Sequence, residues 1–283
     1  MKKGLVLEGG GMRGLFTAGV IDVLMENGVE FDGAVGVSAG AAFGCNYKSN
    51  QPGRSIRYNT RFARDKRYCS IRSLIKTGDL FGADFCYNEL PYKLDIFDGE
   101  AFNNSPMDFW VVCTDVTNGK PVYHKCTNAY SNCFNWIRAS ASMPLAARVV
   151  EIDGYKLLDG GVADSIPLRF MEKTGYDKNV VILTQPRGFV KRKMTGFSVM
   201  KLGLRKYPEL VKAMENRHRM YNSELRYIRR SESAGKSFVI APDDALPIKR
   251  TEHDPDNMLN VYRLGRQAAM DSLDQLKEFL DIA

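Results

Sequence analysis

Gly36-Val37-Ser38-Ala39-Gly40 ends an apolar run that begins at Phe31, and small residues suited to a helix follow as far as Cys45. A Gly-x-Ser-x-Gly pattern at a strand-to-helix corner is typical of a nucleophile elbow. Side chains two positions before and after the serine would collide in so tight a turn, which explains Gly36 and Gly40. The pattern predicts a serine hydroxyl lifted clear of the backbone, at a helix N-terminus whose free N–H groups face it. Taken alone, it fits a glycine-rich turn with an incidental serine equally well.

A strand–helix–strand unit precedes this corner. Residues 4–7 are a short apolar strand, residues 15–27 carry the apolar stripe of a helix that Gly28 ends, and residues 31–37 are a second strand. This order predicts a parallel sheet with helices on its faces, and therefore an α/β fold.

Further elements follow along the chain. Two dipeptides, Asn118-Gly119 and Asp153-Gly154, mark hairpin turns. Asp254-Pro255 is a good N-cap and first-turn pair for a long final helix to about residue 280. We expect helices at 39–50, within the basic stretch to 78 and at 128–142, a connection through 106, and strands at 109–116, 122–124, 149–158, 179–184 and 237–241. The strand at 179–184 is expected to close the main sheet, and two basic amphipathic segments follow Pro186.

A glycine-rich loop follows the first strand. Gly9, Gly11 and Gly14 satisfy G-x-G-x-x-G, which suggests a dinucleotide fold. Binding of a dinucleotide needs an acidic residue at the end of the second strand, whereas Asp32 lies at the start of this strand. The position therefore argues against a bound cofactor.

The same loop can stabilise an anion, because consecutive glycines let several backbone N–H groups converge on one point. If the first two strands are neighbours, the loop lies beside Ser38. The N–H groups of Gly10, Gly11 and Met12 could then hold a tetrahedral oxyanion. One such donor is worth about 3 kcal/mol of transition-state stabilisation.

A serine hydroxyl needs a base to take its proton. Asp159-Gly160-Gly161 is the best candidate, since it places an acid at a strand end with two glycines that allow close approach. Without the other two motifs, an ordinary turn aspartate would be the better interpretation.

Together the three motifs resemble the patatin-like phospholipase family of acyl hydrolases, bacterial type, in order and spacing. Residues 139–144 (Ala-Ser-Ala-Ser-Met-Pro) and Ile166-Pro167 are also similar to the family's. Ser165 departs from it, because relatives commonly carry asparagine there, which puts local hydrogen bonding in question. The similarity covers roughly residues 4–185 and is weaker in the C-terminal hundred.

The resemblance implies a three-layer α/β/α fold with a mostly parallel central sheet and a Ser–Asp dyad, with Ser38 as nucleophile and Asp159 as base. It implies cleavage of phospholipids or related acyl lipids without cofactor or metal. Residues 1–185 would form the catalytic domain, and 186–283 a basic helical region packed on or extending it. Arg13 would brace the loop by pairing with a carboxylate or with carbonyls. The oxyanion loop would comprise Gly9, Gly10, Gly11, Met12, Arg13 and Gly14, and the flanking glycines would be Gly36, Gly40, Gly160 and Gly161.

Composition agrees with a globular protein of one large domain: 283 residues, 44% hydrophobic, 26% charged. No apolar run could cross a bilayer, and the N-terminal apolar stretch is too short for a secretory signal, so we expect a cytoplasmic protein, peripheral at the inner membrane face. The six cysteines form no C-x-x-C pair and the three histidines are scattered, which argues against a metal site.

Two other functions stay open from the sequence. A Ser-His-Asp esterase or thioesterase would use His218 or His253, in the chain order of α/β-hydrolases. The net charge of +7 is also compatible with a non-enzymatic module that binds a membrane or nucleic acid. No nucleic-acid-binding motif is present in the sequence, however, and we do not expect nucleic acid as a partner. Residues 189–207 mix apolar and basic side chains, and we expect them to lie on an anionic lipid surface or to cover the site.

Overall fold

Within the residues that the computed structural model describes, 1–195 and 197–282, an eight-stranded sheet has the order β5-β6-β3-β2-β1-β7-β8, and β4 pairs with β3 outside this path. The strands are β1 (Lys3–Leu7), β2 (Gly33–Val37), β3 (Asp108–Asp115), β4 (Pro121–Lys125), β5 (Val150–Ile152), β6 (Tyr155–Asp159), β7 (Lys178–Ile182) and β8 (Ser237–Ile240). The five strands from β3 to β8 along this order pair in parallel, whereas β4, β5 and β6 pair antiparallel. The expected mostly parallel sheet is confirmed.

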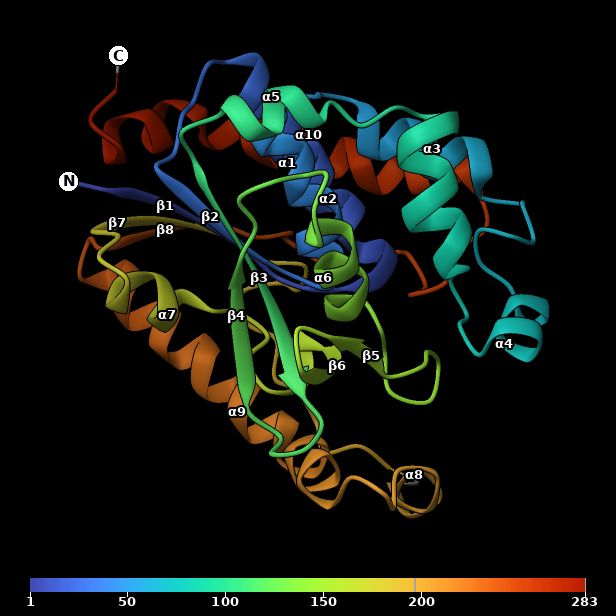
Figure 1. Cartoon of the computed structure of the whole chain (residues 1–283). Helices are drawn as coiled ribbons and strands as arrows, with labels where there is room; N and C mark the ends of the chain where they lie inside the picture. The colour runs from blue at the N-terminus through green and yellow to red at the C-terminus, as the bar shows by residue number, and fades with distance from the viewer. Residues whose placement is uncertain (196, 283) are drawn as a thin grey trace.

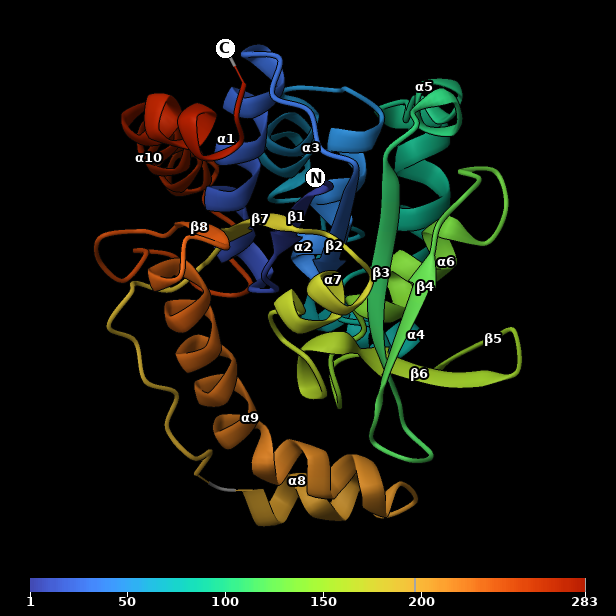
Figure 2. The same cartoon turned by 90° about the vertical axis from the view of Figure 1, so that its left-hand side faces the viewer.

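Helices cover both faces of the sheet (Figures 1 and 2). On one face lie α1 (Gly14–Glu26), α2 (Ala39–Lys48), α3 (Arg54–Phe62), α6 (Cys133–Ser140) and α10 (Pro255–Phe279), and on the other α7 (Leu168–Lys173) and α9 (Pro208–Ser233). Shorter elements are η1 (Gly11–Arg13), α4 (Ile71–Thr77), the π-helical η2 (Phe85–Leu94), α5 (Gly99–Asn104), η3 (Gly160–Val162) and α8 (Phe197–Gly203). The three-layer α/β/α architecture is therefore confirmed.

Alternate side chains of the central strands face the two helical layers. Leu5 and Leu7 of β1 pack in the core formed with α1, α2 and α10. Val6, between them, packs in the core formed with α7 and α9. Because successive side chains of a strand point to opposite faces, a strand covered on both sides is apolar throughout.

The predicted hairpin turns and final helix are confirmed. Gly119 has φ +68°, and the second turn has φ +49° at Asp153 and +81° at Gly154. The Asp254 side chain accepts a hydrogen bond from the Asp256 N–H at 3.2 Å and so caps α10.

Several expected elements have different bounds. The helix expected from 128 begins only at Cys133, because the Asn128 side chain accepts from the Tyr130 N–H at 2.8 Å and holds a turn there. The basic stretch to residue 78 is two helices, α3 and α4, and the connection through 106 contains η2 and α5. The strand at 179–184 was wrongly expected to close the sheet, since β8 pairs with β7 beyond it.

Candidate active site

Ser38 stands at a strained corner between β2 and α2. Its φ of +54° with ψ of −120° lies in a backbone region that residues with a side chain rarely adopt. A Cβ on Gly36 would lie 2.6 Å from the Ala41 nitrogen, and one on Gly40 would collide with the Leu7 carbonyl. Both glycines are therefore required by close approach, as the elbow pattern predicts.

The structure brings Ser38 and Asp159 together. The Ser38 Oγ donates a hydrogen bond to Asp159 Oδ2 at 2.8 Å, and both residues are buried. The Gly161 N–H donates to the other carboxylate oxygen, Oδ1, at 2.7 Å. Asp159 is the last residue of β6, so the end of one strand holds the carboxylate and the end of another holds the hydroxyl. The Gly161 contact orients the carboxylate toward the serine.

Burial raises the pKa of the Asp159 carboxyl above its ordinary value. The neighbouring Arg217 guanidinium and the Ser38 hydrogen bond oppose this shift without cancelling it. A carboxylate with a raised pKa accepts the proton of a serine hydroxyl more readily.

The glycine loop lies beside the serine because β1 and β2 are parallel neighbours, with Leu7 opposite Gly36. A Cβ on Gly9 would lie 3.0 Å from Ser38 Cβ. The Met12 N–H donates to the Arg250 carbonyl at 3.3 Å, so it is already occupied. Within the described residues the N–H groups of Gly10 and Gly11 donate to no protein atom. Of the three N–H groups predicted to hold the oxyanion, these two therefore have no acceptor among the described residues.

Two other predicted residues, Gly14 and Gly160, are needed for close packing at the site, whereas Arg13 does not have the role expected of it. A Cβ on Gly14 would lie 2.8 Å from Ala39 Cβ, so this glycine lets α1 start against α2. A Cβ on Gly160 would collide with the Val112 carbonyl. Arg13 was expected to brace the loop, but within the part of the chain that is described it forms no ion pair or hydrogen bond, and its buried Nε has no partner. The expectation for Arg13 is wrong, because Glu8, the nearby carboxylate, is already held by other donors.

Ser140 is a positioning residue that the sequence analysis missed. Its Oγ accepts the Ser38 N–H at 2.8 Å and donates to the Val112 carbonyl at 2.6 Å. It therefore fixes the backbone of the elbow to β3. The similarity of residues 139–144 to the family's was the available signal.

Ser165 and Glu8 tie the surroundings together. The Ser165 Oγ donates to the Gly161 carbonyl at 2.8 Å, so this serine side chain holds the loop after Asp159. The buried Glu8 carboxylate accepts from the Thr184 N–H and from the Tyr221 hydroxyl, both at 2.6 Å. Burial raises the pKa of Glu8. The end of β1 is thereby attached both to the end of β7 and to α9.

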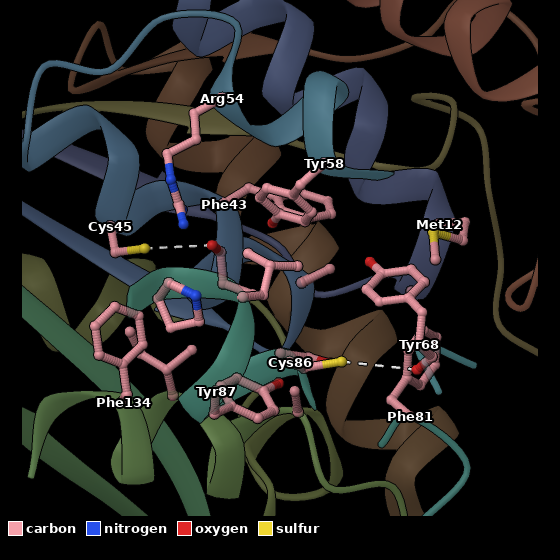
Figure 3. Close-up of a pocket in the computed structure, with 18 of the residues that line it drawn as sticks. Met12, Phe43, Cys45, Arg54, Tyr58, Tyr68, Phe81, Cys86, Tyr87 and Phe134 are labelled. Atoms are coloured by element: carbon pink, nitrogen blue, oxygen red, sulfur yellow. Dashed lines mark hydrogen bonds between the residues drawn. The ribbon is translucent and has the colours of Figure 1, made fainter. Parts of the chain in front are cut away.

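Ser38 borders an apolar cavity of about 110 Å³ (Figure 3). Rings from several elements surround this space, including Phe43 of α2, Tyr58 of α3, Tyr87 of η2 and Phe134 of α6. Met12 lies at one side of it. Such a lining suits an alkyl chain.

A second cavity, of about 170 Å³, meets the first at Ser38. It contains Asp159 and the glycine loop, and four basic side chains lie among the apolar ones of its other walls. The basic residues that line it are Arg13, Lys191, Arg217 and Arg250. The Arg217 Nε donates to the Gly161 carbonyl, which holds this side chain at the site.

The two histidines of the alternative triad lie elsewhere. The Nδ1 of His218 is 3.1 Å from the Glu215 carbonyl, and the Nδ1 of His253 is 2.9 Å from the Ala63 carbonyl. Of the residues that the structure describes, no histidine lines either cavity beside Ser38.

The model of the family described as patatin-like phospholipase matches residues 5–171. The chain belongs to this family. A second model, a domain of unknown function (DUF6363), matches residues 207–281. The first match thus ends within α7, and the second begins one residue before α9.

Two relatives each match a little under two thirds of the chain. The uncharacterized protein YjjU of Escherichia coli K12 is 31% identical over 188 residues, which cover 64% of this chain and 52% of that protein. Lysophospholipase nte1 of Aspergillus oryzae is 31% identical over 186 residues, 62% of this chain and 11% of that protein. The chain therefore spans about half of the first relative and about a tenth of the second. The crystal structure of VipD from Legionella pneumophila is similar with a TM-score of 0.49 and 14% identity, over 97% of this chain and 67% of that one.

Neither a metal site nor a membrane-spanning helix is found among the residues that the structure describes. Across residues 1–195 and 197–282, no group of three or more His, Cys, Asp or Glu side chains is placed to hold a metal ion. The helices formed by these residues are all too short or too polar to span a bilayer.

Proposed function

We propose that this chain is a serine acyl hydrolase that cleaves carboxylic esters of phospholipids or related acyl lipids. Ser38 is the nucleophile and Asp159 its base, without histidine. The observation that carries the proposal is the 2.8 Å hydrogen bond from Ser38 Oγ to Asp159 Oδ2 at the border of an apolar cavity. The family and the relatives named lysophospholipase agree with it.

The reaction proceeds in two half-reactions. The Ser38 Oγ attacks the ester carbonyl carbon while its proton passes to Asp159, and the Gly10 and Gly11 N–H groups stabilise the resulting oxyanion. The C–O bond to the alcohol breaks, and Asp159 returns the proton to the leaving oxygen. Water then attacks the acyl-enzyme, Asp159 takes its proton, and collapse of the second tetrahedral species releases the fatty acid and restores Ser38.

Substitution of the dyad tests this mechanism. We expect Ser38→Ala and Asp159→Asn each to lower kcat on p-nitrophenyl butyrate about 10⁴-fold, the scale seen when members of a catalytic triad are removed. A fluorophosphonate probe should label wild type at Ser38, as peptide mapping would report, and should not label Ser38→Ala.

The histidine variants separate the dyad from a triad. His218→Ala and His253→Ala should hydrolyse the same ester at the wild-type rate. A loss of activity in either folded variant would contradict the dyad and favour the Ser-His-Asp alternative.

We further propose that one end of the molecule contacts an anionic membrane. Large apolar side chains are exposed there: Ile71 and Ile75 of α4, 71% and 80% exposed, and Leu202 of α8, 69% exposed. Loop 143–148 joins these helices, because Leu145 lies against Gly203 and the Leu80 N–H donates to the Ala146 carbonyl at 2.8 Å. Exposed basic residues accompany them: Arg72, Lys76, Arg148, Lys201 and Arg205.

This surface revises the expectation for residues 189–207. Leu204 is buried against Leu210 and Met214, so it cannot contact lipid. Lys191 and Met194 line the basic cavity and so cover the site in part. The side chains of Val199 and Met200 lie outside the described residues.

Co-sedimentation with vesicles tests the membrane contact. Wild type should bind phosphatidylglycerol vesicles more strongly than phosphatidylcholine vesicles, and Ile71→Asp with Ile75→Asp should weaken binding at least tenfold. Met270→Asp, which alters a 59% exposed methionine on α10, is the matched control and should bind as wild type. Binding that is indifferent to lipid charge would contradict the electrostatic part of the proposal.

A further inference from the structure

The basic cavity beside Ser38 holds more positive charge than its surroundings compensate. Four cationic side chains line it: Arg13, Lys191, Arg217 and Arg250. Within the described part of the chain, none of the four forms an ion pair with a carboxylate. The carboxylates in the same cavity are Asp159 and Glu8. Four cations therefore face at most two anions.

The arrangement of these cations is fixed by the fold. The Lys191 N–H donates to Asn222 Oδ1 at 2.8 Å, and the Lys191 carbonyl accepts from Asn222 Nδ2 at 3.0 Å, which attaches the lysine to α9. Its Nζ lies 4.6 Å from the centre of the Tyr221 ring. The Arg250 carbonyl accepts the Met12 N–H, so this arginine is anchored at the glycine loop. The backbones that carry Lys191 and Arg250 are thereby attached to α9 and to the glycine loop.

Two observations indicate that these groups await a ligand. The Nε of Arg13 is buried without a hydrogen-bond partner, which is costly in a folded protein. Burial, followed by repulsion from the neighbouring guanidinium groups, lowers the pKa of Lys191 to about 8. An anion in the cavity would lie beside the Arg13 guanidinium and would offset the repulsion that acts on Lys191.

The position of the cavity defines the ligand. Ser38 separates it from the apolar cavity, so an ester whose carbonyl lies at Ser38 can extend its acyl chain into one space and its alcohol part into the other. We infer that Lys191, Arg217 and Arg250 form a subsite for a phosphate group on the alcohol part, which selects acyl lipids of net negative head-group charge. This inference rests on the proposed acyl hydrolysis and adds its substrate class. A zwitterionic head group would bring its own cation toward the same basic walls, and so would bind less well.

Binding to the inactive Ser38→Ala variant tests the inference without turnover. We would titrate dodecyl phosphate, dodecylphosphocholine and inorganic phosphate, below micelle-forming concentrations, by isothermal titration calorimetry. Dodecyl phosphate should bind at least tenfold more tightly than dodecylphosphocholine, and inorganic phosphate more weakly than dodecyl phosphate, because it lacks the chain. Equal affinity for the two dodecyl compounds would overturn the head-group preference. Inorganic phosphate as tight as dodecyl phosphate would overturn the lipid as the source of the anion.

Charge variants locate the subsite. Lys191→Gln and Arg250→Gln, in the Ser38→Ala background, should each weaken dodecyl phosphate binding about tenfold, since each removes a charge-assisted contact. Arg217 is less suitable for such a substitution, because its side chain also donates a hydrogen bond to the Gly161 carbonyl. Arg226→Gln removes the same charge from an exposed position on α9 and should bind as wild type. An equal loss in Arg226→Gln would overturn the subsite in favour of a general effect of net charge.

The same variants with Ser38 restored distinguish this inference from the acyl-hydrolase proposal. The ratio of kcat/KM for an acylglycerol phosphate to that for a neutral acylglycerol should fall about tenfold in Lys191→Gln and Arg250→Gln. A wild-type protein that cleaves neither substrate yet still prefers dodecyl phosphate would refute acyl hydrolysis and not the anion site. Cleavage of both with an unchanged ratio in the variants would refute the subsite and not the hydrolase.

Discussion

Ser38 is held by hydrogen bonds at its backbone as well as at its side chain. The Ser140 Oγ accepts a hydrogen bond from the Ser38 N–H and donates one to the Val112 carbonyl of β3, so it links the elbow to this strand. The strained φ of +54° at Ser38 persists only because such contacts determine it. We therefore expect that the elbow loses its alignment with Asp159 when this hydroxyl is removed.

Ser140→Ala should lower kcat about 10- to 100-fold with little change in KM, because an unsatisfied buried donor costs about 1–3 kcal/mol and each tenfold in rate corresponds to about 1.4 kcal/mol. The rate of fluorophosphonate labelling should fall in parallel. Ser142→Ala is the control, since the Ser142 Oγ donates only to the Arg138 carbonyl in the same segment. A folded Ser140→Ala enzyme with wild-type kcat would contradict the positioning role.

Ionisation of Asp159 should raise the activity of the protein and lower its stability. Its pKa is raised by burial, so the folded protein binds this proton more tightly than the unfolded chain does. Wild type therefore loses stability as the pH rises from the ordinary value of 3.8 through the raised pKa, whereas Asp159→Asn does not. In the same interval activity should rise, because the base must be ionised.

Urea unfolding at several pH values checks this. Asp159→Asn should have a higher free energy of unfolding than wild type at pH 7, and the difference should shrink toward zero below the ordinary aspartate pKa. Asp271→Asn, at an exposed position of α10, should show no such pH dependence. A variant less stable than wild type at pH 7 would mean that the charged carboxylate stabilises the fold.

At the scale of elements, the contact between α1 and α10 joins the region that the family model matches to the C-terminal region. A Cβ on Gly19 of α1 would collide with the Tyr262 carbonyl, and one on Gly265 of α10 would collide with the Phe16 carbonyl. The two helices thus approach backbone to backbone. Gly265→Val should destabilise the protein by about 1–3 kcal/mol, the usual cost of overpacking. Arg263→Ala, exposed on the same helix, should leave the midpoint of urea unfolding unchanged, and an equal effect of both would contradict the close-packing argument.

Elements with local signals could be predicted from the sequence, and those without could not. The elbow, the two hairpins and the cap of α10 depend on residues within a few positions of one another, so their patterns are visible in the chain. The helix expected from 128 starts late because a single asparagine side chain forms a turn. The π-helical η2, which contains Pro91, has no pattern that distinguishes it from a connection.

The residues of the candidate site likewise include some that the sequence reveals and some that it does not. Ser38, Asp159 and the glycine loop could be found because each sits in a recognisable motif at a strand end. The basic cavity could not, because Lys191, Arg217 and Arg250 come from separate segments without a motif and meet only when α9 and the loop after β8 fold over the site. The sequence predicted basic amphipathic segments after Pro186, but amphipathicity does not tell which basic side chain faces inward.

At the scale of the whole molecule, the two family models match separate parts of the chain. The sheet and its helical layers, however, contain elements from both parts. The first 185 residues alone would lack β8, which pairs with β7, and the two long helices, which cover opposite faces of the sheet. The large buried side chains lost with those helices include Tyr221, Leu225 and Ile228 of α9, and Met258, Val261 and Leu276 of α10. Burial of each contributes about 1.5–3 kcal/mol, so their sum is comparable with the about 5–15 kcal/mol by which whole domains are stable.

We therefore predict that a fragment of residues 1–185 does not fold, and that the C-terminal region extends the catalytic domain instead of forming a separate one. The fragment should show no cooperative thermal unfolding by circular dichroism and no fluorophosphonate labelling at Ser38. The full-length chain, purified in the same way, is the control, and adding residues 186–283 in trans should restore part of the labelling. A fragment that unfolds cooperatively and reacts with the probe would instead make residues 186–283 an accessory that supplies only the basic wall of the site.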